Sequence, residues 1–362
     1  MGARSVMDQG ILALHPFLVN GALSLIVLRA MRNRGIDIHI GYYLPGAGGY
    51  TPDRAEDFAV DDRLIDFSDA HGVAGVDMLA SVVRERQIGL VLQIGSPWAY
   101  PQLPYLKERE PQRRIVDVLY NKVGHTLNHF LFEACLDGVI VESSDMQEFI
   151  SNNTSKTKPN IYKVESGIDL KTYSPKRSAP DGNSLVVGYF GRMSPEKNPL
   201  GFVALAEYLH AAIPELRFVM FGEGEMSQTV RERIEAGPAS EVINFGGYVE
   251  HPSMALAQLD ILVVPSKLDG RPNVIMEANA CGIPVIGAPI GGIPELVQHG
   301  CNGFLFRPDE FREISRVVSE WVKNIAKYKE HQIACRVIAE KHFDRERMLN
   351  DYEAVFRRLL RN

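Results

Sequence analysis

Residues 185–199 read LVVGYFGRMSPEKNP, an apolar run followed by a glycine and a polar loop. The run Leu185–Phe190 is rich in β-branched and aromatic residues, which predicts a buried strand. Pro199 suits the first turn of a helix and Asn198 suits its N-cap, so we expect a helix to begin there. Strand, loop and helix in this order are the building unit of a parallel α/β sheet.

The same alternation of strand-like and helix-like segments extends from this stretch toward both ends of the chain. Strands are expected at 10–16, 36–43, 63–66, 88–94, 115–120 and 139–141 in the first half, and at 185–190, 217–221, 242–245, 261–264 and 285–286 in the second. Helices are expected between them, for example at 22–34, 73–86 and 126–135. Nearly continuous apolar strands separated by helices indicate parallel sheets covered on both faces, so we predict the α/β class.

Two domains account for this pattern. A chain of 362 residues is long enough for two ordinary domains. The stretch 172–184, with Pro175, Pro180 and Gly182, lacks apolar periodicity and reads as a linker. We therefore expect one domain over residues 1–172 and a second over 185–344. The apolar spacing of residues 345–362 predicts a single amphipathic helix at the end.

Composition and charge favour a cytoplasmic protein that does not bind nucleic acid. Hydrophobic residues make up 45% of the chain and charged residues 23%, and the net charge is −6, which argues against a nucleic-acid surface. No apolar run approaches the roughly 18 residues of a membrane span, and the N-terminus lacks the pattern of a secretory signal. The four cysteines, at 135, 281, 301 and 335, are too scattered for a disulfide framework or a zinc site.

The loop at 191–199 has a combination of residues that suits the binding of a diphosphate. Gly191 allows close approach of the backbone, and Arg192 and Lys197 place two cations near the start of a helix. Taken alone, such a loop is more often a turn with two solvated charges.

A second loop, with the sequence DGRPNVIME at 269–277, follows the strand at 261–264. Pro272 again marks a first helical position, so the backbone amides of Asn273 and Val274 are available to an anion. Glu277 lies about one and a half turns further on, and its two oxygens can accept hydrogen bonds from the two hydroxyls of a ribose. A lone helical glutamate, by contrast, usually caps or pairs locally.

In this order the motifs resemble the donor domain of the family-four retaining glycosyltransferases with the GT-B fold, over residues 187–306. The corresponding elements are Gly191-Arg192 with Lys197, Gly222-Glu223-Gly224, Asp269 and Glu277 with seven residues between them as in the family's Glu-x7-Glu pattern, Gly291-Gly292 with Glu295, and Gly300 with Gly303-Phe304. The run EANACGIPV at 277–285 is close to the family's Glu-Ala-x-Ala-x-Gly-x-Pro-Val segment. Five elements in the right order are a specific signal, whereas a single Gly-x-Gly is not.

The resemblance implies two Rossmann-like domains that face each other across a cleft, with the C-terminal helix crossing back to the first domain. It implies that the donor is bound by Gly21, Gly191, Gly222, Gly270, Arg271, Pro272, Asn273, Val274 and Glu277. It assigns catalytic roles to His125, Arg192, Lys197 and Asp269, and it implies no metal and no other cofactor. One departure is Asp269, which is one methylene shorter than the family's glutamate at the position that contacts the transferred sugar.

The first half carries two weaker matches. Gly21, in the loop at 19–22, corresponds to the family's glycine-rich loop beside the donor diphosphate, and His125, in the sequence NKVGHT, corresponds to a histidine against the transferred sugar. His125, His129 and Glu133 also recur every four residues along one helix face, and with Asp117 they could ligate a metal. Since such spacings arise readily by chance, we favour no metal.

The expected reaction is transfer of a sugar from a UDP- or GDP-sugar to a hydroxyl of a glycan or lipid-linked acceptor, in surface polysaccharide, lipopolysaccharide or glycolipid synthesis. Peripheral contact with the inner face of the membrane is a further possibility, through arginines at 29, 32, 34, 357, 358 and 361, although cations late in a helix also complement its dipole. The alternatives are a GT-B nucleotide-sugar epimerase, a glycan phosphorylase and a non-catalytic nucleotide-sugar-binding protein. A Rossmann oxidoreductase fits poorly, because no Gly-x-Gly-x-x-Gly follows the first strand.

Overall fold

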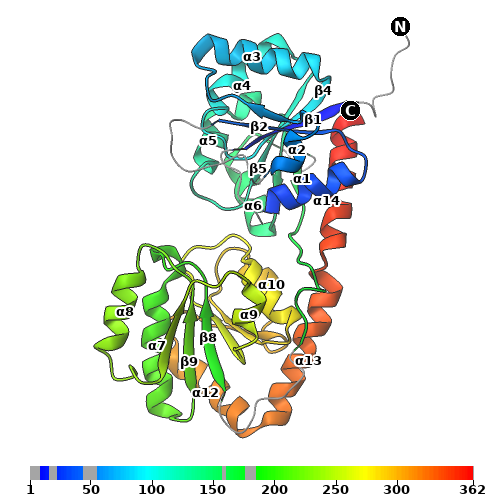
Figure 1. The fold of residues 1–362 in the computed structure, drawn as a ribbon. Helices are drawn as coiled ribbons and strands as arrows, with labels where there is room; N and C mark the ends of the chain where they lie inside the picture. The colour runs from blue at the N-terminus through cyan, green and yellow to red at the C-terminus, as the bar shows by residue number, and fades with distance from the viewer. Residues whose placement is uncertain (1–8, 16–22, 44–54, 157–159, 176–184, 362) are drawn as a thin grey trace. The chain divides into compact units, whose positions relative to one another are not determined.

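The computed structural model describes residues 9–15, 23–43, 55–156, 160–175 and 185–361 (Figure 1). The chain forms two compact units, the first made of Met1–Glu165 with Met348–Asn362 and the second of Ser166–Arg347. Each unit is an α/β domain with its own sheet.

The first unit is built on a parallel sheet with the order β3-β2-β1-β4-β5-β6-β7 among the described residues. Its strands are β1 (Gly10–His15), β2 (Ile38–Tyr42), β3 (Leu64–Asp66), β4 (Ile88–Gln93), β5 (Arg114–Leu119), β6 (Gly138–Val141) and β7 (Ile161–Lys163). Every residue of β1, β2, β4 and β6 is buried, as expected for strands covered on both faces.

Helices cover both faces of this sheet. One face carries α1 (Leu23–Asn33), α2 (Glu56–Ala59) and the C-terminal α14 (Arg345–Arg361), and the other carries α3 (Gly72–Glu85), α4 (Leu103–Arg109) and α6 (Ser144–Asn153). A short helix, α5 (Thr126–Leu131), follows β5 and ends before the 3₁₀ turn Glu133–Cys135. Met348, Tyr352 and Phe356 of α14 are buried in the core between α14, α1 and the sheet, which confirms that the last helix returns to the first domain.

The second unit has the strand order β10-β9-β8-β11-β12-β13, again parallel throughout the described residues. Its strands are β8 (Val186–Phe190), β9 (Arg217–Phe221), β10 (Ile243–Gly247), β11 (Ile261–Val264), β12 (Val285–Gly287) and β13 (Gly303–Leu305). This is the order of the Rossmann fold, in which the chain reverses direction across the sheet between the first and fourth strands, here β8 and β11.

The second sheet is also covered on both faces (Figure 1). One face carries α7 (Pro199–Ala212), α8 (Ser227–Glu235) and α12 (Phe311–Lys323), and the other carries α9 (Pro252–Leu256), α10 (Asn273–Ala280), α11 (Ile293–Leu296) and α13 (Ile325–His342). The predicted strands all form, with ends that differ by a residue or two. The structure adds β7 and β13, which are only three residues long.

The division between the units falls before Ser166, ahead of the stretch 172–184 at which the sequence places it. Ile168 and Tyr173 are the reason, because both are buried in the core of the second unit. The Ile168 amide also donates to the Phe343 carbonyl over 2.8 Å, which ties this segment to the end of α13. In the part of the chain that the structure describes, no helix is long and apolar enough to cross a membrane.

Candidate functional site

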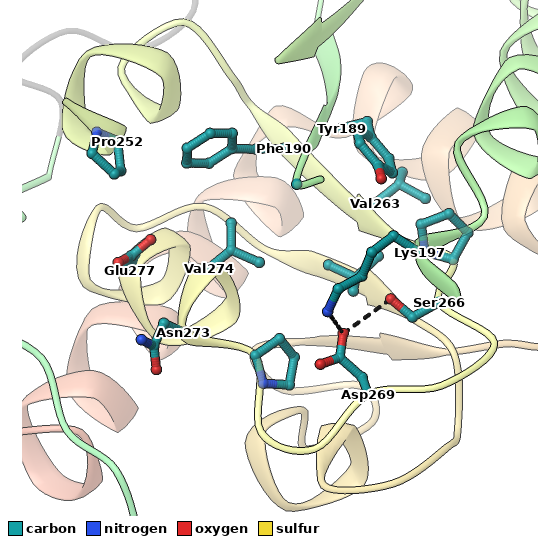
Figure 2. A pocket seen from close by; sticks show the side chains of 14 residues that line it. Tyr189, Phe190, Lys197, Pro252, Val263, Ser266, Asp269, Asn273, Val274 and Glu277 are labelled. Carbon is teal, nitrogen blue, oxygen red and sulfur yellow. Dashed lines mark hydrogen bonds and ion pairs between the residues drawn. The ribbon is translucent and has the colours of Figure 1, made fainter. Parts of the chain in front are cut away.

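A pocket of about 260 Å³ opens in the second unit where β8 and β11 end (Figure 2). Tyr189, Phe190 and Gly191 line it from the end of β8, and Val264 to Ser266 line it from the end of β11. This is the point at which the strand order reverses, the usual ligand-binding position of an open parallel sheet.

Seven of the residues predicted from the sequence line this pocket together: Gly191, Lys197, Asp269, Pro272, Asn273, Val274 and Glu277. They come from the loop after β8 and from the loop that leads into α10, so segments about 80 residues apart meet at one edge of the sheet. Arg192, Gly270 and Arg271 belong to these loops and Gly222 packs against Gly191, but none of the four lines the pocket.

Lys197 and Asp269 form an ion pair inside the pocket. Lys197 Nζ donates to Asp269 Oδ2 over 2.7 Å, and Ser266 Oγ donates to the same oxygen over 3.1 Å (Figure 2). The side chain of Asp269 is only 7% exposed. The predicted sugar-contacting acid is thus paired with the predicted phosphate-binding lysine.

Arg192 lies at the surface beside the pocket. Its side chain is 67% exposed, and its Nη2 is 3.1 Å from Glu196 Oε1. A hydrogen bond from Ser194 and the nearby charges of Arg192 and Lys197 hold the pKa of Glu196 below its ordinary value. Exposed ion pairs of this kind contribute little, so the arginine can turn toward a bound anion at small cost.

Glu277 lies on α10 with its carboxylate in the pocket. Tyr173 Oη donates to Glu277 Oε1 over 2.9 Å, and no other hydrogen bond to this carboxylate comes from the residues described. Burial raises the pKa of the Glu277 carboxyl, and the hydrogen bond from Tyr173 acts in the opposite direction.

The start of α10 differs by one residue from the prediction. Pro272 is the N-cap residue, with φ −68° and ψ 119°, and the helix begins at Asn273 rather than at Pro272. The extended ψ of the proline sets the direction in which the chain enters the helix. The backbone amides of Asn273 and Val274 still lie in the first turn, where amides have no partner within the helix, so they remain available to an anion as predicted.

Two glycines predicted from the sequence shape the pocket through its loops. A Cβ on Gly222, which has φ +122°, would lie 1.9 Å from the Gly191 carbonyl oxygen. A Cβ on Gly291, with φ +54°, would lie 1.8 Å from the Asp269 carbonyl oxygen, and the Gly292 amide donates to the Gly270 carbonyl over 2.6 Å. Both glycines allow a second loop to pack directly on a loop that lines the pocket.

The candidate residues of the first unit are only partly described. Gly21 lies outside the described residues. His125 precedes α5, and its Nε2–H donates to the Val118 carbonyl over 3.2 Å, while the backbone of Gly95 lies against the other ring nitrogen. The histidine is therefore held where β4 and β5 end.

Of the residues of the alternative metal hypothesis, His129 and Asp117 pair with each other, whereas His125 and Glu133 have other partners. His129 Nδ1 donates to Asp117 Oδ2 over 3.0 Å with both side chains fully buried, and Tyr100 also donates to Asp117. Glu133 accepts from Ser155 instead. Over the described residues, no three His, Cys, Asp or Glu side chains gather as metal ligands would.

Among the residues that escaped the sequence analysis are Phe190 and Pro252, which line the pocket, and Tyr173, which does not line it but contacts Glu277. Phe190 could have been found, since it ends the strand that precedes the loop predicted to bind the diphosphate. Tyr173 lies in the stretch that reads as a linker, about 100 residues before the glutamate that it contacts. No local pattern indicates this contact.

Comparison with known proteins finds similarity to glycosyltransferases over the part of the chain that contains these residues. Residues 171–335 match the model of the family described as glycosyl transferases group 1. The chain is 29% identical over 239 residues to the UDP-Gal:alpha-D-GlcNAc-diphosphoundecaprenol alpha-1,3-galactosyltransferase of Escherichia coli, a match that covers 56% of this chain and 62% of that protein. It is 28% identical over 179 residues to a GDP-mannose-dependent alpha-mannosyltransferase of Corynebacterium glutamicum, covering 47% of this chain and 41% of the relative. The chain thus spans less than two thirds of the length of both relatives.

Solved structures share the fold of the whole chain. Alr3699/HepE of Anabaena, in complex with UDP, superimposes with a TM-score of 0.76 at 19% identity and covers 97% of this chain and 100% of its own. A glycosyltransferase of Rickettsia africae has a TM-score of 0.76 at 17% identity, covering 98% of this chain and 99% of its own. These likenesses confirm the predicted fold class of two Rossmann-like domains. The pocket lies within residues 171–335, the part of the chain that matches the model of the glycosyl transferases group 1.

Proposed function

We propose that this chain is a retaining glycosyltransferase that moves a sugar from a UDP- or GDP-sugar to a hydroxyl of a glycan or lipid-linked acceptor. The observation that carries the proposal is the pocket at the ends of β8 and β11, in which a carboxylate, an ammonium and the start of a helix converge. A nucleotide diphosphate needs these three groups, one for its ribose and two for its phosphates.

The proposed roles follow from the positions of the side chains. Glu277 accepts the ribose hydroxyls, and the first amides of α10 and Lys197 bind the diphosphate. Arg192, which is exposed beside the pocket, turns from Glu196 to the phosphates when the donor binds. These fixed positive charges stabilise the nucleotide diphosphate as it leaves, without a metal ion.

The first unit supplies the acceptor side of the proposed reaction. His125 positions the transferred sugar, and its Nε2–H is already used by the Val118 carbonyl. Of the two ring nitrogens, Nδ1 is therefore the one left for a ligand, next to the Gly95 backbone. The acceptor hydroxyl attacks on the face from which the nucleotide departs, and the anomeric configuration is retained.

The named relatives support the choice of substrates. One uses a UDP-sugar and a diphosphoundecaprenol-linked acceptor, and another uses GDP-mannose. We therefore propose a glycan or lipid-linked acceptor, in the synthesis of surface polysaccharide or glycolipid. A non-catalytic nucleotide-sugar-binding protein is the alternative that the same pocket allows, whereas nothing in the comparisons favours an epimerase.

The arginines considered for membrane contact have partners within the protein. Arg29 pairs with Asp57, Arg32 with Asp61, and Arg34 with Glu353. Arg357 also pairs with Glu353, and Arg358 lies over the ring of Tyr162. These contacts give the arginines a role within the protein that does not involve a membrane. We therefore propose peripheral membrane contact only through a lipid-linked acceptor.

The first experiment is a thermal-shift panel with UDP, GDP and their sugars, with and without EDTA. We expect one nucleotide family to raise the melting temperature, and the rise to be unchanged by EDTA. Release of free nucleotide from the stabilising nucleotide sugar, with retention of configuration, then distinguishes an enzyme from a binding protein. No shift with any nucleotide would overturn the proposed donor.

A further inference from the structure

Tyr173 belongs to the second unit and contacts Glu277, a residue of the pocket, although it does not line the pocket itself. Its hydroxyl donates to Glu277 Oε1 over 2.9 Å, while its ring is 8% exposed and packs in the core of the second unit. Burial raises the pKa of the Tyr173 phenol, so the hydroxyl keeps its proton and remains a donor throughout the neutral range. It is the hydrogen-bond donor to Glu277 within the described part of the chain.

The backbone of the segment that carries Tyr173 is fixed to the same unit. Arg336 Nη1, on α13, donates to the Tyr173 carbonyl over 2.9 Å and to the Ala280 carbonyl, at the end of α10, over 2.8 Å. One guanidinium therefore joins the segment that carries the tyrosine to the helix that carries the glutamate. Five residues earlier, the Ile168 amide donates to Phe343. The tyrosine is held in place independently of any ligand.

We propose that Tyr173 is a positioning residue for nucleotide binding: its hydroxyl fixes the Glu277 carboxylate so that both ribose hydroxyls of the donor can bind to it. The inference rests on the proposed ribose-binding role of Glu277. Of the two carboxylate oxygens, Oε1 already accepts one hydrogen bond and keeps lone-pair capacity for a second, while Oε2 accepts none from the described residues. A carboxylate held in one rotamer binds two vicinal hydroxyls without first being ordered.

The hydrogen bond also affects the charge of Glu277. Burial raises the pKa of this carboxyl and the donation from Tyr173 opposes that rise. The protonated form has one acceptor fewer, so nucleotide affinity should fall as the pH falls through the Glu277 pKa. Without the tyrosine hydroxyl the pKa is higher, and the fall should begin at a higher pH. Two other groups affect the pKa of Tyr173: Cys281 raises it and Arg345 lowers it. The charged residues that line the pocket together with Glu277 are Lys197 and Asp269.

The test compares Tyr173→Phe with Tyr328→Phe in the full-length protein. Tyr328 is also buried in the second unit, where its hydroxyl donates to the Asp260 carbonyl over 2.8 Å, and it does not line the pocket. The two variants lose the same group from the same unit, so Tyr328→Phe reports the effect of a lost buried hydroxyl on the fold. Calorimetry at several values between about pH 5.5 and pH 8 measures binding of UDP and of 2′,3′-dideoxy-UDP, a range in which a raised carboxyl pKa can be followed. If the thermal-shift panel selects GDP, then GDP and its 2′,3′-dideoxy analogue replace the uridine nucleotides in this and the following experiments.

We expect Tyr173→Phe to weaken UDP binding by about fivefold to tenfold near neutral pH, the effect of losing one hydrogen bond to a charged group. The loss should grow as the pH is lowered, and the preference for UDP over the dideoxy analogue should shrink. Tyr328→Phe should keep both the pH profile and the preference of the original protein.

The failure of this inference differs from the failure of the proposed function. Identical pH profiles and ribose preferences for Tyr173→Phe and Tyr328→Phe would overturn the role of Tyr173. If in that case Glu277→Ala still abolishes the ribose preference, the proposed role of Glu277 stands. If the original protein does not distinguish UDP from its dideoxy analogue, the ribose assignment itself is wrong.

Discussion

At the scale of single residues, the ion pair between Lys197 and Asp269 decides what charge a diphosphate meets in the pocket. The two side chains are 24% and 7% exposed, and their charged atoms are 2.7 Å apart. A carboxylate this close and this shielded from water offsets much of the field of the ammonium. A bound diphosphate must therefore compete with Asp269 for Lys197.

Asp269→Asn should consequently bind UDP more tightly, by about threefold to tenfold, because the variant keeps the size of the side chain and removes its charge. Isothermal titration calorimetry with UDP, which has no sugar, separates this effect from any contact with the transferred sugar. Sugar transfer by the same variant should decrease if the proposed sugar contact of Asp269 is correct.

The control uses Lys197→Met, alone and combined with Asp269→Asn. If the aspartate acts on UDP through the ammonium, the double variant should bind UDP like Lys197→Met alone. Weaker UDP binding by Asp269→Asn in the presence of Lys197 would contradict this account, and would mean that the carboxylate itself contacts the nucleotide.

The pairing illustrates what the sequence can and cannot predict at this scale. Lys197, Asp269 and Glu277 were predicted for one site, and they line one pocket because each follows a strand end of the same sheet edge. Which charge pairs with which depends on rotamers and on the separation of two loops. The same limit applies to Tyr173, whose contact with Glu277 spans 104 residues. The roles of these residues in binding and catalysis stay predictions.

At the scale of elements, the loops of the pocket are shaped by backbone contacts that require glycine. Gly291 has φ +54°, and a Cβ there would lie 1.8 Å from the Asp269 carbonyl oxygen. Gly300 has φ +79° in the same unit, with nothing within 4 Å of its Cβ position. The two positions therefore share the unfavourable backbone conformation but differ in the clash.

Gly291→Ala should be the more damaging of these two substitutions. Gly300→Ala should cost about 1 kcal/mol of unfolding free energy through its backbone conformation alone, whereas Gly291→Ala should cost about 2–4 kcal/mol and should also displace Asp269. Urea unfolding gives the stabilities, and calorimetry with UDP gives the binding. Equal losses at both positions, with unchanged UDP affinity, would show that the loop accommodates a methyl group.

Patterns of apolar residues predict whole elements better than their ends. Strands of four or more residues were all expected from the sequence, and so were the three-residue strands β3 and β12. The strands that were missed, β7 and β13, are also three residues long, a length at which periodicity gives little signal. The helix expected over 126–135 ends at Leu131, and the following residues form a 3₁₀ turn. Fraying between an α-helix and a 3₁₀ turn depends on tertiary packing, which a local pattern does not contain.

At the scale of the whole molecule, the first unit is completed by the end of the chain. Phe356 and Tyr352 of α14 are 1% and 4% exposed, and they pack with α1 and with residues of β1, β2, β4 and β5. The chain forms most of the first unit, then the second, and then returns to the first, so the stability of the first unit depends on residues that follow the second unit in the sequence. The sequence predicted α14 from its amphipathic spacing, and the return of α14 followed from the family resemblance.

Phe356→Ala and Phe202→Ala make this dependence measurable, since each removes a fully buried ring from one unit. Either change should cost about 3–5 kcal/mol in its own unit. In differential scanning calorimetry, we expect one unfolding transition whose midpoint temperature rises with UDP and one whose midpoint does not. Phe202→Ala should lower the midpoint temperature of the first, and Phe356→Ala should lower that of the second. The assignment works because a ligand stabilises only the folded unit that binds it. The contradicting outcome is a single transition whose midpoint temperature falls in Phe356→Ala and rises with UDP. The two units would then unfold cooperatively, and α14 would link the stability of the first unit to occupancy of the pocket in the second.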